Sequence, residues 1–199
     1  MKKKVLSLVL ITGLIMGLTA CATKPVDKTK EKKKESTEKS EVGTLSEDGT
    51  FKAADGSYSI CLPEGWTLDK ESTSDLVSFT SDKKDIIEIV SLSGEDVKGS
   101  LEVFPATAEE YNATKLKDAP AKEITKYNIL KDSETGVETF QIYCKYEKGE
   151  KNPYTFTALS GIQDQEVGKY YAANAMIQSE GKEEEVATVI DSFAVLNLE

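Results

Sequence analysis

The chain has 199 residues, with 25 basic residues, all of them lysine, against 35 acidic ones, and it contains no histidine. Without histidine there is no Ser-His-Asp or Cys-His catalytic arrangement and no histidine-ligated zinc. Without arginine there is no bidentate guanidinium to recognise phosphate, and the formal net charge of -10 repels nucleic acid. The composition therefore excludes histidine-dependent enzyme classes and argues against a nucleic-acid partner.

Residues 1–20 have the organisation of a secretory signal peptide, because three lysines after the initiator precede an apolar run over residues 5–18. As a helix this run would be about 21 Å long, whereas the about 20 residues of a membrane-spanning helix extend over about 30 Å. The tetrapeptide Leu18-Thr19-Ala20-Cys21 resembles the bacterial lipobox. That resemblance implies a diacylglycerol thioether on Cys21, which would become the first residue of the mature chain.

A lipid at Cys21 would anchor the chain without spanning the membrane, since two acyl chains bind stably where one binds only reversibly. We therefore expect the protein on the outer face of a bacterial cytoplasmic membrane. A long lysine-rich segment after the anchor favours a Gram-positive envelope over a Gram-negative periplasm. The alternative is an ordinary signal peptide followed by a chance cysteine.

Residues 21–48 are predicted to form a disordered tether. From Ala22 to Asp48 seven lysines oppose seven acidic residues, and only Val26, Val42 and Leu45 are sizeable apolar side chains. Such a segment buries too little apolar surface to offset the entropy of ordering. A flexible coil of this length would hold the domain roughly 25 to 30 Å from the anchor. A dedicated lysine-rich binding motif is the alternative.

Residues 49–199 are predicted to form one acidic domain, with 15 lysines against 28 acidic residues. A domain of 151 residues buries about two-thirds of its chain surface without needing a disulfide. Cys61 and Cys144 both fall in predicted strands, and the sequence leaves open whether they form a disulfide. Free, packed thiols are the favoured interpretation.

Seven apolar or alternating runs predict strands, the first two flanking the hairpin turn Asp55-Gly56. They cover residues 50–53, 57–62, 76–80, 86–92, 137–146, 154–162 and 169–178. Thr107-Ala108-Glu109-Glu110 is a capping box that predicts a helix near 108–116. A second helix is predicted near 182–195, where Val186, Val189, Ile190 and Phe193 share one face. Hairpin-linked strands with segregated helices indicate an α+β domain with a mostly antiparallel sheet.

The segment from Phe51 through Asp55-Gly56-Ser57-Tyr58 to Pro63-Glu64-Gly65-Trp66 resembles the opening of PsbP-like domains, and Ile190-Asp191-Ser192-Phe193 resembles their C-terminal helix end. The resemblance covers residues 50–197. It implies an α/β/α sandwich around a six- or seven-stranded, mostly antiparallel sheet. That fold serves an extrinsic photosystem II subunit and a nuclear-import factor that binds a small GTPase, so the resemblance implies an interaction scaffold without a common active site.

Four aromatic residues are candidates for an interaction surface: Trp66, Tyr143, Tyr170 and Tyr171. Trp66 follows a turn and either packs there or forms a ligand platform. The tyrosines fall on late strands and either line an exposed aromatic patch or occupy ordinary sheet positions.

The leading hypothesis is a non-catalytic binding or accessory module, without a cofactor, that engages an envelope protein or a small ligand. One alternative is a domain that binds Ca²⁺ or Mg²⁺ through Glu95-Asp96, Asp164-Glu166 and Glu183-Glu184-Glu185, although none of these clusters matches a twelve-residue calcium loop. A histidine-independent hydrolase with paired carboxylates is a further alternative, but no pair of acids is distinguished by its surroundings. The sequence does not identify the ligand, the partner or any catalytic or metal-ligating residue.

Overall fold

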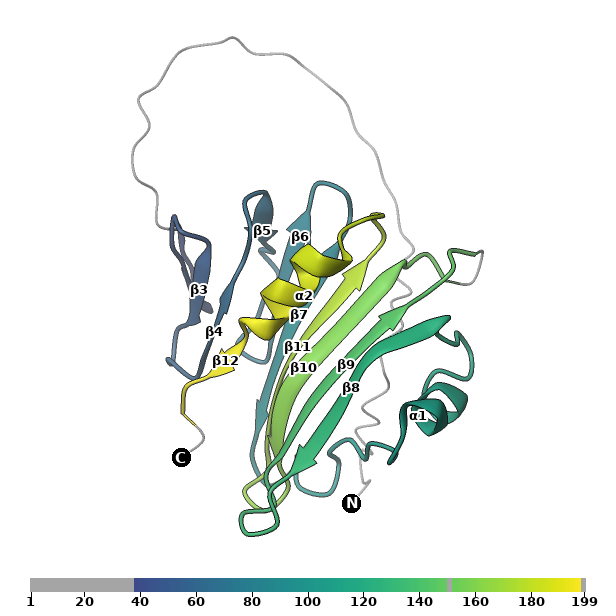
Figure 1. The fold of residues 1–199 in the computed structure, drawn as a ribbon. Coiled ribbons are helices and arrows are strands. Elements are labelled where there is room, and N and C mark those ends of the chain that lie inside the picture. Colours follow the sequence, from purple (N-terminus) through teal and green to yellow (C-terminus); the bar gives the residue numbers. More distant parts are fainter. Residues whose placement is uncertain (1–37, 150–151, 198–199) are drawn as a thin grey trace, which may run out of the picture.

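The computed structural model describes residues 38–149 and 152–197. Its centre is a seven-stranded sheet with the order β5-β6-β7-β11-β10-β9-β8, in which every neighbouring pair is antiparallel (Figure 1). The strands are β5 (Trp66–Leu68), β6 (Leu76–Ser81), β7 (Ile86–Ser93), β8 (Glu123–Lys131), β9 (Glu138–Lys145), β10 (Phe156–Asp164) and β11 (Lys169–Ile177). The predicted α+β class with a mostly antiparallel sheet is confirmed.

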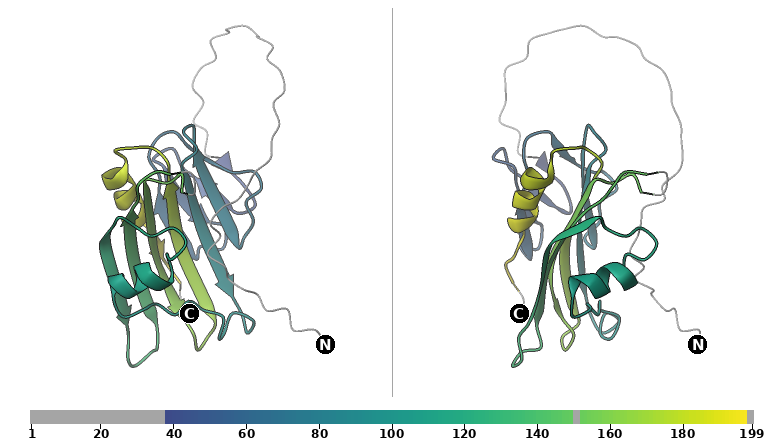
Figure 2. Two further views of the ribbon diagram at one scale, coloured as in Figure 1. Left: turned by 90° about the vertical axis from the view of Figure 1, so that its right-hand side faces the viewer. Right: turned by 45° about the vertical axis from the view of Figure 1, so that its right-hand side comes forward.

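A second, smaller sheet and two helices cover the large sheet. The smaller sheet contains β1 (Glu38–Lys39), β2 (Gly43–Leu45), β3 (Thr50–Ala53), β4 (Tyr58–Cys61) and β12 (Ala194–Val195). The helices are α1 (Ala108–Thr114) and α2 (Glu183–Asp191). Figure 2 shows α2 and the smaller sheet on one face of the large sheet and α1 on the other. The helices therefore enclose the sheet from both sides, as the predicted sandwich requires.

Strand β11 is buried on both faces. Tyr171, Ala173 and Ile177 point into the larger core, which also contains residues of β3, β4 and α2. The alternate residues Tyr170 and Ala172 point into a smaller core on the opposite face. Because successive side chains of a strand alternate between faces, one strand supplies both cores and joins the two covering layers.

The large sheet differs from the predicted one in two of its strands. The predicted strands 50–53 and 57–62 form part of the smaller sheet instead, while β5 and β8 complete the large one. Strand β8 escaped prediction because its pattern is irregular. A register shift between Ile124 and Lys126 interrupts its alternation, and as a terminal strand it exposes several side chains.

The C-terminal helix ends at Asp191, so its predicted extension to residue 195 is wrong. The Ser192 hydroxyl donates to the Val189 carbonyl at 2.6 Å and accepts the Cys61 backbone N–H at 2.9 Å. Ala194 and Val195 then pair with β4, which gives their backbone groups partners outside the helix. The capping prediction for α1 is confirmed at Thr107, whose side chain accepts the Glu110 backbone N–H.

The folded part begins earlier than predicted. Strands β1 and β2 lie inside the segment 21–48 that was predicted as a disordered tether, and Val42 packs against the larger core. The pairing of β2 with β3 explains this difference, since β3 belongs to the folded domain and gives β2 a partner outside this segment. The signal peptide, Cys21 and the tether up to residue 37 lie outside the described residues. Within the described part of the chain, no helix is long and apolar enough to cross a membrane.

Gly161 lies at a close approach of three central strands. A Cβ atom added there would lie 2.4 Å from the Tyr171 carbonyl oxygen and 2.5 Å from Phe140 Cζ. We expect Gly161→Ala to lower the free energy of unfolding by about 1–3 kcal/mol, because the backbone of the neighbouring strand cannot move away cheaply. Urea unfolding of the full chain measures this.

The matched control is Gly149→Ala, where an added Cβ meets no atom within 4 Å and φ is not positive. This substitution should change the free energy of unfolding by no more than about 0.5 kcal/mol. Equal losses for the two variants would contradict the packing argument.

Candidate functional site

Three of the four predicted surface aromatics are core residues. Tyr143 is 4% exposed and Tyr171 is 7% exposed in the larger core, while Tyr170 is 7% exposed and stacks on Phe140 on the opposite face. Of the two alternatives for these tyrosines, the shared exposed patch is wrong and the ordinary sheet positions are confirmed. The physical reason is that both faces of β11 are covered, so its adjacent tyrosines point into two different cores.

Tyr143 has a structural role at the end of α2. Its hydroxyl donates to Asp191 Oδ1, which also accepts Gln141 Nε2 and Lys126 Nζ at 3.0 Å each. Partial burial acts to raise the pKa of Asp191, but the hydrogen bonds from Tyr143 and Lys126 outweigh it and hold that pKa below its usual value. The carboxylate thus fastens α2 to β8 and β9.

Trp66 is the one predicted aromatic that lines a cleft. It is half-buried at the start of β5 and borders a cavity of about 130 Å³. The cleft is walled by the turn before β5 (residues 64–65), the β6–β7 turn (residues 81–85) and the start of α2 (Lys182, Glu185 and Val186). Three segments far apart in the sequence therefore meet around the only tryptophan of the chain.

The position of Trp66 follows from its turn and its strand pairing. Gly65 has a φ of 93°, a backbone conformation that L side chains rarely adopt, so glycine is required where the chain turns into β5. Trp66 then pairs with Ser81 of β6, and its side chain packs partly against the larger core. One part of the indole is held by the core and the rest is available to the cleft.

Two of the cleft walls are fixed to each other by Asp85. This residue is only 4% exposed, and its Oδ1 accepts the backbone N–H groups of Gln178 at 2.8 Å and Ser179 at 3.0 Å. The Ser81 hydroxyl accepts the N–H groups of Lys83 and Asp85, which shapes the turn itself. The β6–β7 turn is thereby joined to the segment that leads into α2, so the cleft is preformed.

The cleft carries charges of both signs. Lys182 pairs with Glu185 at 2.6 Å. In contrast, the side chains of Glu64, Asp82 and Lys83 are exposed and have no hydrogen-bond or ion-pair partner within residues 38–149 and 152–197. An indole face beside unpaired acidic and basic groups can hold a polar, partly flat group by stacking and hydrogen bonding.

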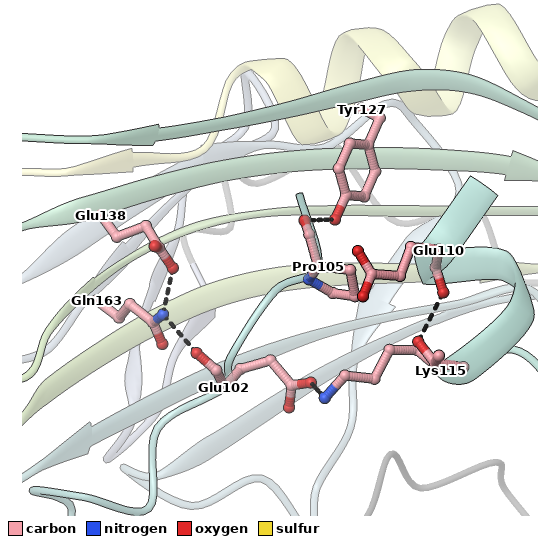
Figure 3. Close-up of polar contacts among 8 residues, drawn as sticks. Glu102, Pro105, Glu110, Lys115, Tyr127, Glu138 and Gln163 are labelled. Atoms are coloured by element: carbon pink, nitrogen blue, oxygen red, sulfur yellow. Dashed lines mark hydrogen bonds and ion pairs between the residues drawn. The ribbon is translucent and has the colours of Figure 1, made fainter. Parts of the chain in front are cut away.

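A second polar arrangement lies on the opposite face, beside α1 (Figure 3). Gln163 is 1% exposed, and its Nε2 donates to the Glu102 carbonyl at 2.8 Å and to Glu138 Oε1 at 2.6 Å. Lys115 Nζ lies 2.6 Å from Glu102 Oε1. These bonds fasten the segment that contains α1 to the sheet. Among the buried side-chain nitrogen and oxygen atoms of the described residues, Gln163 Oε1 alone has no hydrogen-bond partner, so the network is structural and mostly satisfied.

Sequence reasoning missed this network because Gln163 lies just after the predicted strand 154–162. Glu102 lies in an irregular segment and Lys115 at the end of a helix. No spacing pattern marks the three residues as neighbours. Only the alternation of β10, once its register is known, would have pointed Gln163 inward.

The two cysteines of the domain are free and lie in different sheets. Cys144 is buried as predicted, and burial raises the pKa of its thiol to about 11 against weaker opposing hydrogen bonds from Tyr146 and Thr157. It is therefore protonated at neutral pH and is a poor nucleophile. The prediction that Cys61 is packed is wrong, because as the last residue of β4 its side chain is exposed.

The acidic clusters are only partly brought together. Gly94 donates its N–H to the Gly168 carbonyl at 2.9 Å, which places residues 95–96 near the turn that contains Asp164 and Glu166. The cluster Glu183–Glu185 lies elsewhere, in the first turn of α2. Within the described ranges, no group of three or more Cys, Asp or Glu side chains is arranged to hold a metal ion.

Comparison with known proteins gives weak structural similarity only. No protein-family model and no curated protein sequence matches the chain. The solution structure of cyanobacterial PsbP (CyanoP) from Synechocystis matches with a TM-score of 0.48 and 16% identity, over 74% of this chain and 91% of that chain. The Saccharomyces cerevisiae Ran-binding protein Mog1p matches with a TM-score of 0.41 and 9% identity, over 74% of this chain and 95% of that chain. At these values the similarities assign neither a family nor a function.

The cleft geometry predicts a strong stability effect at Asp85. Asp85→Ala would leave the N–H groups of Gln178 and Ser179 without their acceptor, at an expected cost of about 2–4 kcal/mol in the free energy of unfolding. Asp82→Ala, three residues earlier and exposed, should cost no more than about 0.5 kcal/mol. Chemical denaturation of the two full-length variants makes the comparison, and similar losses would show that Asp85 does not hold the walls together.

Proposed function

We propose that this chain is a non-catalytic binding module of PsbP-like architecture, anchored by a lipid on Cys21 to the outer face of a bacterial cytoplasmic membrane. Its binding point is the cleft at Trp66, which accepts a polar segment of an envelope protein or a small polar ligand. The observation that carries this proposal is a half-buried, solitary tryptophan in a cleft whose walls are fixed by a buried carboxylate.

The chemistry of the cleft supports a binding role. Tryptophan is enriched among the residues that dominate binding energy, because it supplies a large, rigid contact surface with a polar N–H. Walls held by the Asp85 hydrogen bonds need little ordering when a ligand enters, which lowers the entropic cost of association. Glu64, Asp82 and Lys83 at the rim have no side-chain partner among the described residues, and their charges can select the orientation of the bound group.

The reactive groups of the chain support a role without catalysis. The sequence has no histidine, and the buried Cys144 thiol is held in its protonated form. The carboxylates of Asp85 and Asp191 accept hydrogen bonds that stabilise the fold. These acids are consequently engaged in holding segments together.

The sequence leader supports membrane anchoring. The basic start, the apolar run and Leu18-Thr19-Ala20-Cys21 agree with export and lipidation. Because the first described strand begins at Glu38, 16 residues separate Cys21 from the folded part. If that lysine-rich segment is a coil, it holds the domain about 20–24 Å from the anchor.

Cys21→Ala tests the anchor. The substitution removes the only thiol that the lipobox can present for lipidation, so the variant should lose its lipid adduct and move from the detergent phase to the aqueous phase after phase partitioning. Mass spectrometry of the N-terminal peptide provides the second measurement. Unchanged partitioning, together with an unmodified native N-terminal peptide, would refute lipid anchoring.

Site-specific photocrosslinking in intact cells tests the cleft. A photoreactive amino acid at Asp82, which is exposed at the cleft, should capture a discrete adduct. The same amino acid at Lys117, exposed beyond α1 on the opposite face, should not capture it. Adding Trp66→Leu to the Asp82 variant should reduce the adduct several-fold, because leucine retains apolar packing but removes the indole surface.

Two outcomes would contradict the proposed cleft. One is equal adduct formation from positions 82 and 117. The other is an Asp82 adduct that Trp66→Leu leaves unchanged while the melting temperature of the variant stays close to that of the native chain. Turnover of a cell-wall or lipid substrate by the purified chain would contradict the non-catalytic assignment.

A further inference from the structure

The terminal strand β8 presents a long unpaired edge. It has nine residues and no proline, it pairs with β9 on one side, and no described strand pairs with its other side. Such an edge exposes a row of backbone donors and acceptors that can be paired by another chain. In Figure 1 the strand forms the border of the large sheet next to α1.

The alternation of the ladder determines which groups face outward. The hairpin closes with a hydrogen bond from the Asp132 N–H to the Val137 carbonyl at 2.8 Å. In an antiparallel pair every second residue is hydrogen-bonded to its partner. Because Asp132 is bonded in this way, the backbone N–H and C=O groups of the even-numbered residues from 126 to 132 point toward β9. The N–H and C=O groups of Tyr127, Ile129 and Lys131 therefore point away from the sheet.

The side chains along this edge also indicate a contact surface. Leu130 is 69% exposed, an unusual position for a leucine in a strand. Pairing places it on the same face as Lys126 and Asn128, because their partners Thr139, Tyr143 and Gln141 are alternate residues of β9. Asn128 and Lys131 are exposed as well, whereas Ile129 is half-buried because its side chain packs on the opposite face of the sheet.

We infer that β8 pairs antiparallel with β8 of a second copy of this chain, about a two-fold axis at Ile129. The pairing joins two seven-stranded sheets into one continuous sheet. The outward N–H and C=O groups of Tyr127, Ile129 and Lys131 provide about six backbone hydrogen bonds across the axis.

Charge complementarity and the regularity of the strand together select this register. With the axis at Ile129, Lys126 of each copy lies opposite Asp132 of the other, which gives two opposite-charge pairs. With the axis at Asn128, Lys126 lies opposite Leu130, and no opposite charges meet between residues 126 and 132. With the axis at Tyr127, Glu123 lies opposite Lys131, but the pairing then extends into the irregularity between Ile124 and Lys126, which the Ile129 axis leaves outside the paired segment.

Asp132 can take part without breaking its present bonds. It uses Oδ1 to accept the N–H groups of Glu134 and Thr135, which leaves Oδ2 for a lysine of the second copy. Lys126 Nζ lies 3.0 Å from Asp191 Oδ1 and 4.7 Å from the centroid of the Tyr143 ring, so on pairing Lys126 exchanges this surface contact for Asp132 of the second copy. An edge contact of this kind is smaller than a stable interface, so we expect a concentration-dependent dimer.

Disulfide trapping of the full chain tests the register. Each variant carries Cys21→Ser and Cys61→Ser, so that the buried Cys144 is the only other thiol, together with Tyr127→Cys, Asn128→Cys or Ile129→Cys. Directly opposite residues in an antiparallel pair have Cα atoms about 5.5 Å apart, within the range that a disulfide spans. Ile129→Cys should give the highest dimer yield under mild oxidation, several-fold above the other two, and the background without an added cysteine should give none.

Two further substitutions in the Ile129→Cys background separate pairing from random collision. Lys131→Pro removes an outward N–H and leaves the ladder to β9 intact, so it should abolish trapping without changing the melting temperature appreciably. Asp132→Asn keeps the turn acceptor but removes the charge, so it should lower the dimer yield several-fold. Sedimentation equilibrium of the chain with native Ile129 should show a dimer fraction that rises with concentration and is lost in Lys131→Pro.

The inference is overturned if trapping is equal at the three positions, is greatest at Tyr127 or Asn128, or survives Lys131→Pro. It is equally overturned if the chain with native Ile129 sediments as a monomer at all concentrations. The sedimentation measurement does not depend on the folding of the Ile129→Cys variant, and neither measurement depends on the Trp66 cleft.

Discussion

Burial of the large sheet on both faces is the constraint on which the rest of the structure depends. The middle strands carry apolar side chains on both sides, so neither face can be left to water. One face is covered by the smaller sheet with α2, and the other by the segment that contains α1. Strands β1 to β4 and the C-terminal strand β12 belong to the same smaller sheet. Segments from both ends of the described chain therefore cover one face of the large sheet together.

Polar side chains fasten these covers at defined points. Asp85 holds the segment before α2, and Asp191 holds the end of the same helix to β8 and β9. Gln163 and Glu102 hold the opposite cover. Asp85, Gln163 and Glu102 are paired in a partly or fully buried setting, where loss of one partner leaves the other with an uncompensated desolvation cost, whereas Asp191 is more exposed. They determine how the layers are oriented, while apolar burial supplies the main driving force.

The two surfaces proposed for recognition consist of groups that the packing of the layers leaves partly uncovered or unpaired. The cleft at Trp66 lies where three segments converge and the indole is only partly covered. The outer edge of β8 has no neighbouring strand among the described residues because the large sheet is open and β8 is its terminal strand. The two surfaces use different chemistry, since the cleft offers an aromatic face with charged groups and the edge offers backbone hydrogen bonds. A ligand in the cleft and a second copy at the edge therefore need not compete.

Local sequence patterns determined those features that depend on neighbours along the chain. Alternation predicted the strands that became β6, β7, β9, β10 and β11, and the capping threonine Thr107 predicted the start of α1. Such patterns reflect backbone geometry and local hydrogen bonding, which are already present in a short segment. The α+β class and the turn at Trp66 were accessible in the same way.

Only the tertiary structure decided what depends on contacts between distant segments. The sequence pattern predicted that Tyr143, Tyr170 and Tyr171 lie in strands. Their burial depended on which layer covers each face of the sheet. Strands β2 and β12 exist because the folded domain supplies their partners, and a three-residue or two-residue segment shows no period of its own. The role of Asp85 likewise depends on N–H groups more than 90 positions away along the chain. Sequence periodicity reports which side of an element is apolar, whereas burial and hydrogen-bond pairing are properties of what packs against that side.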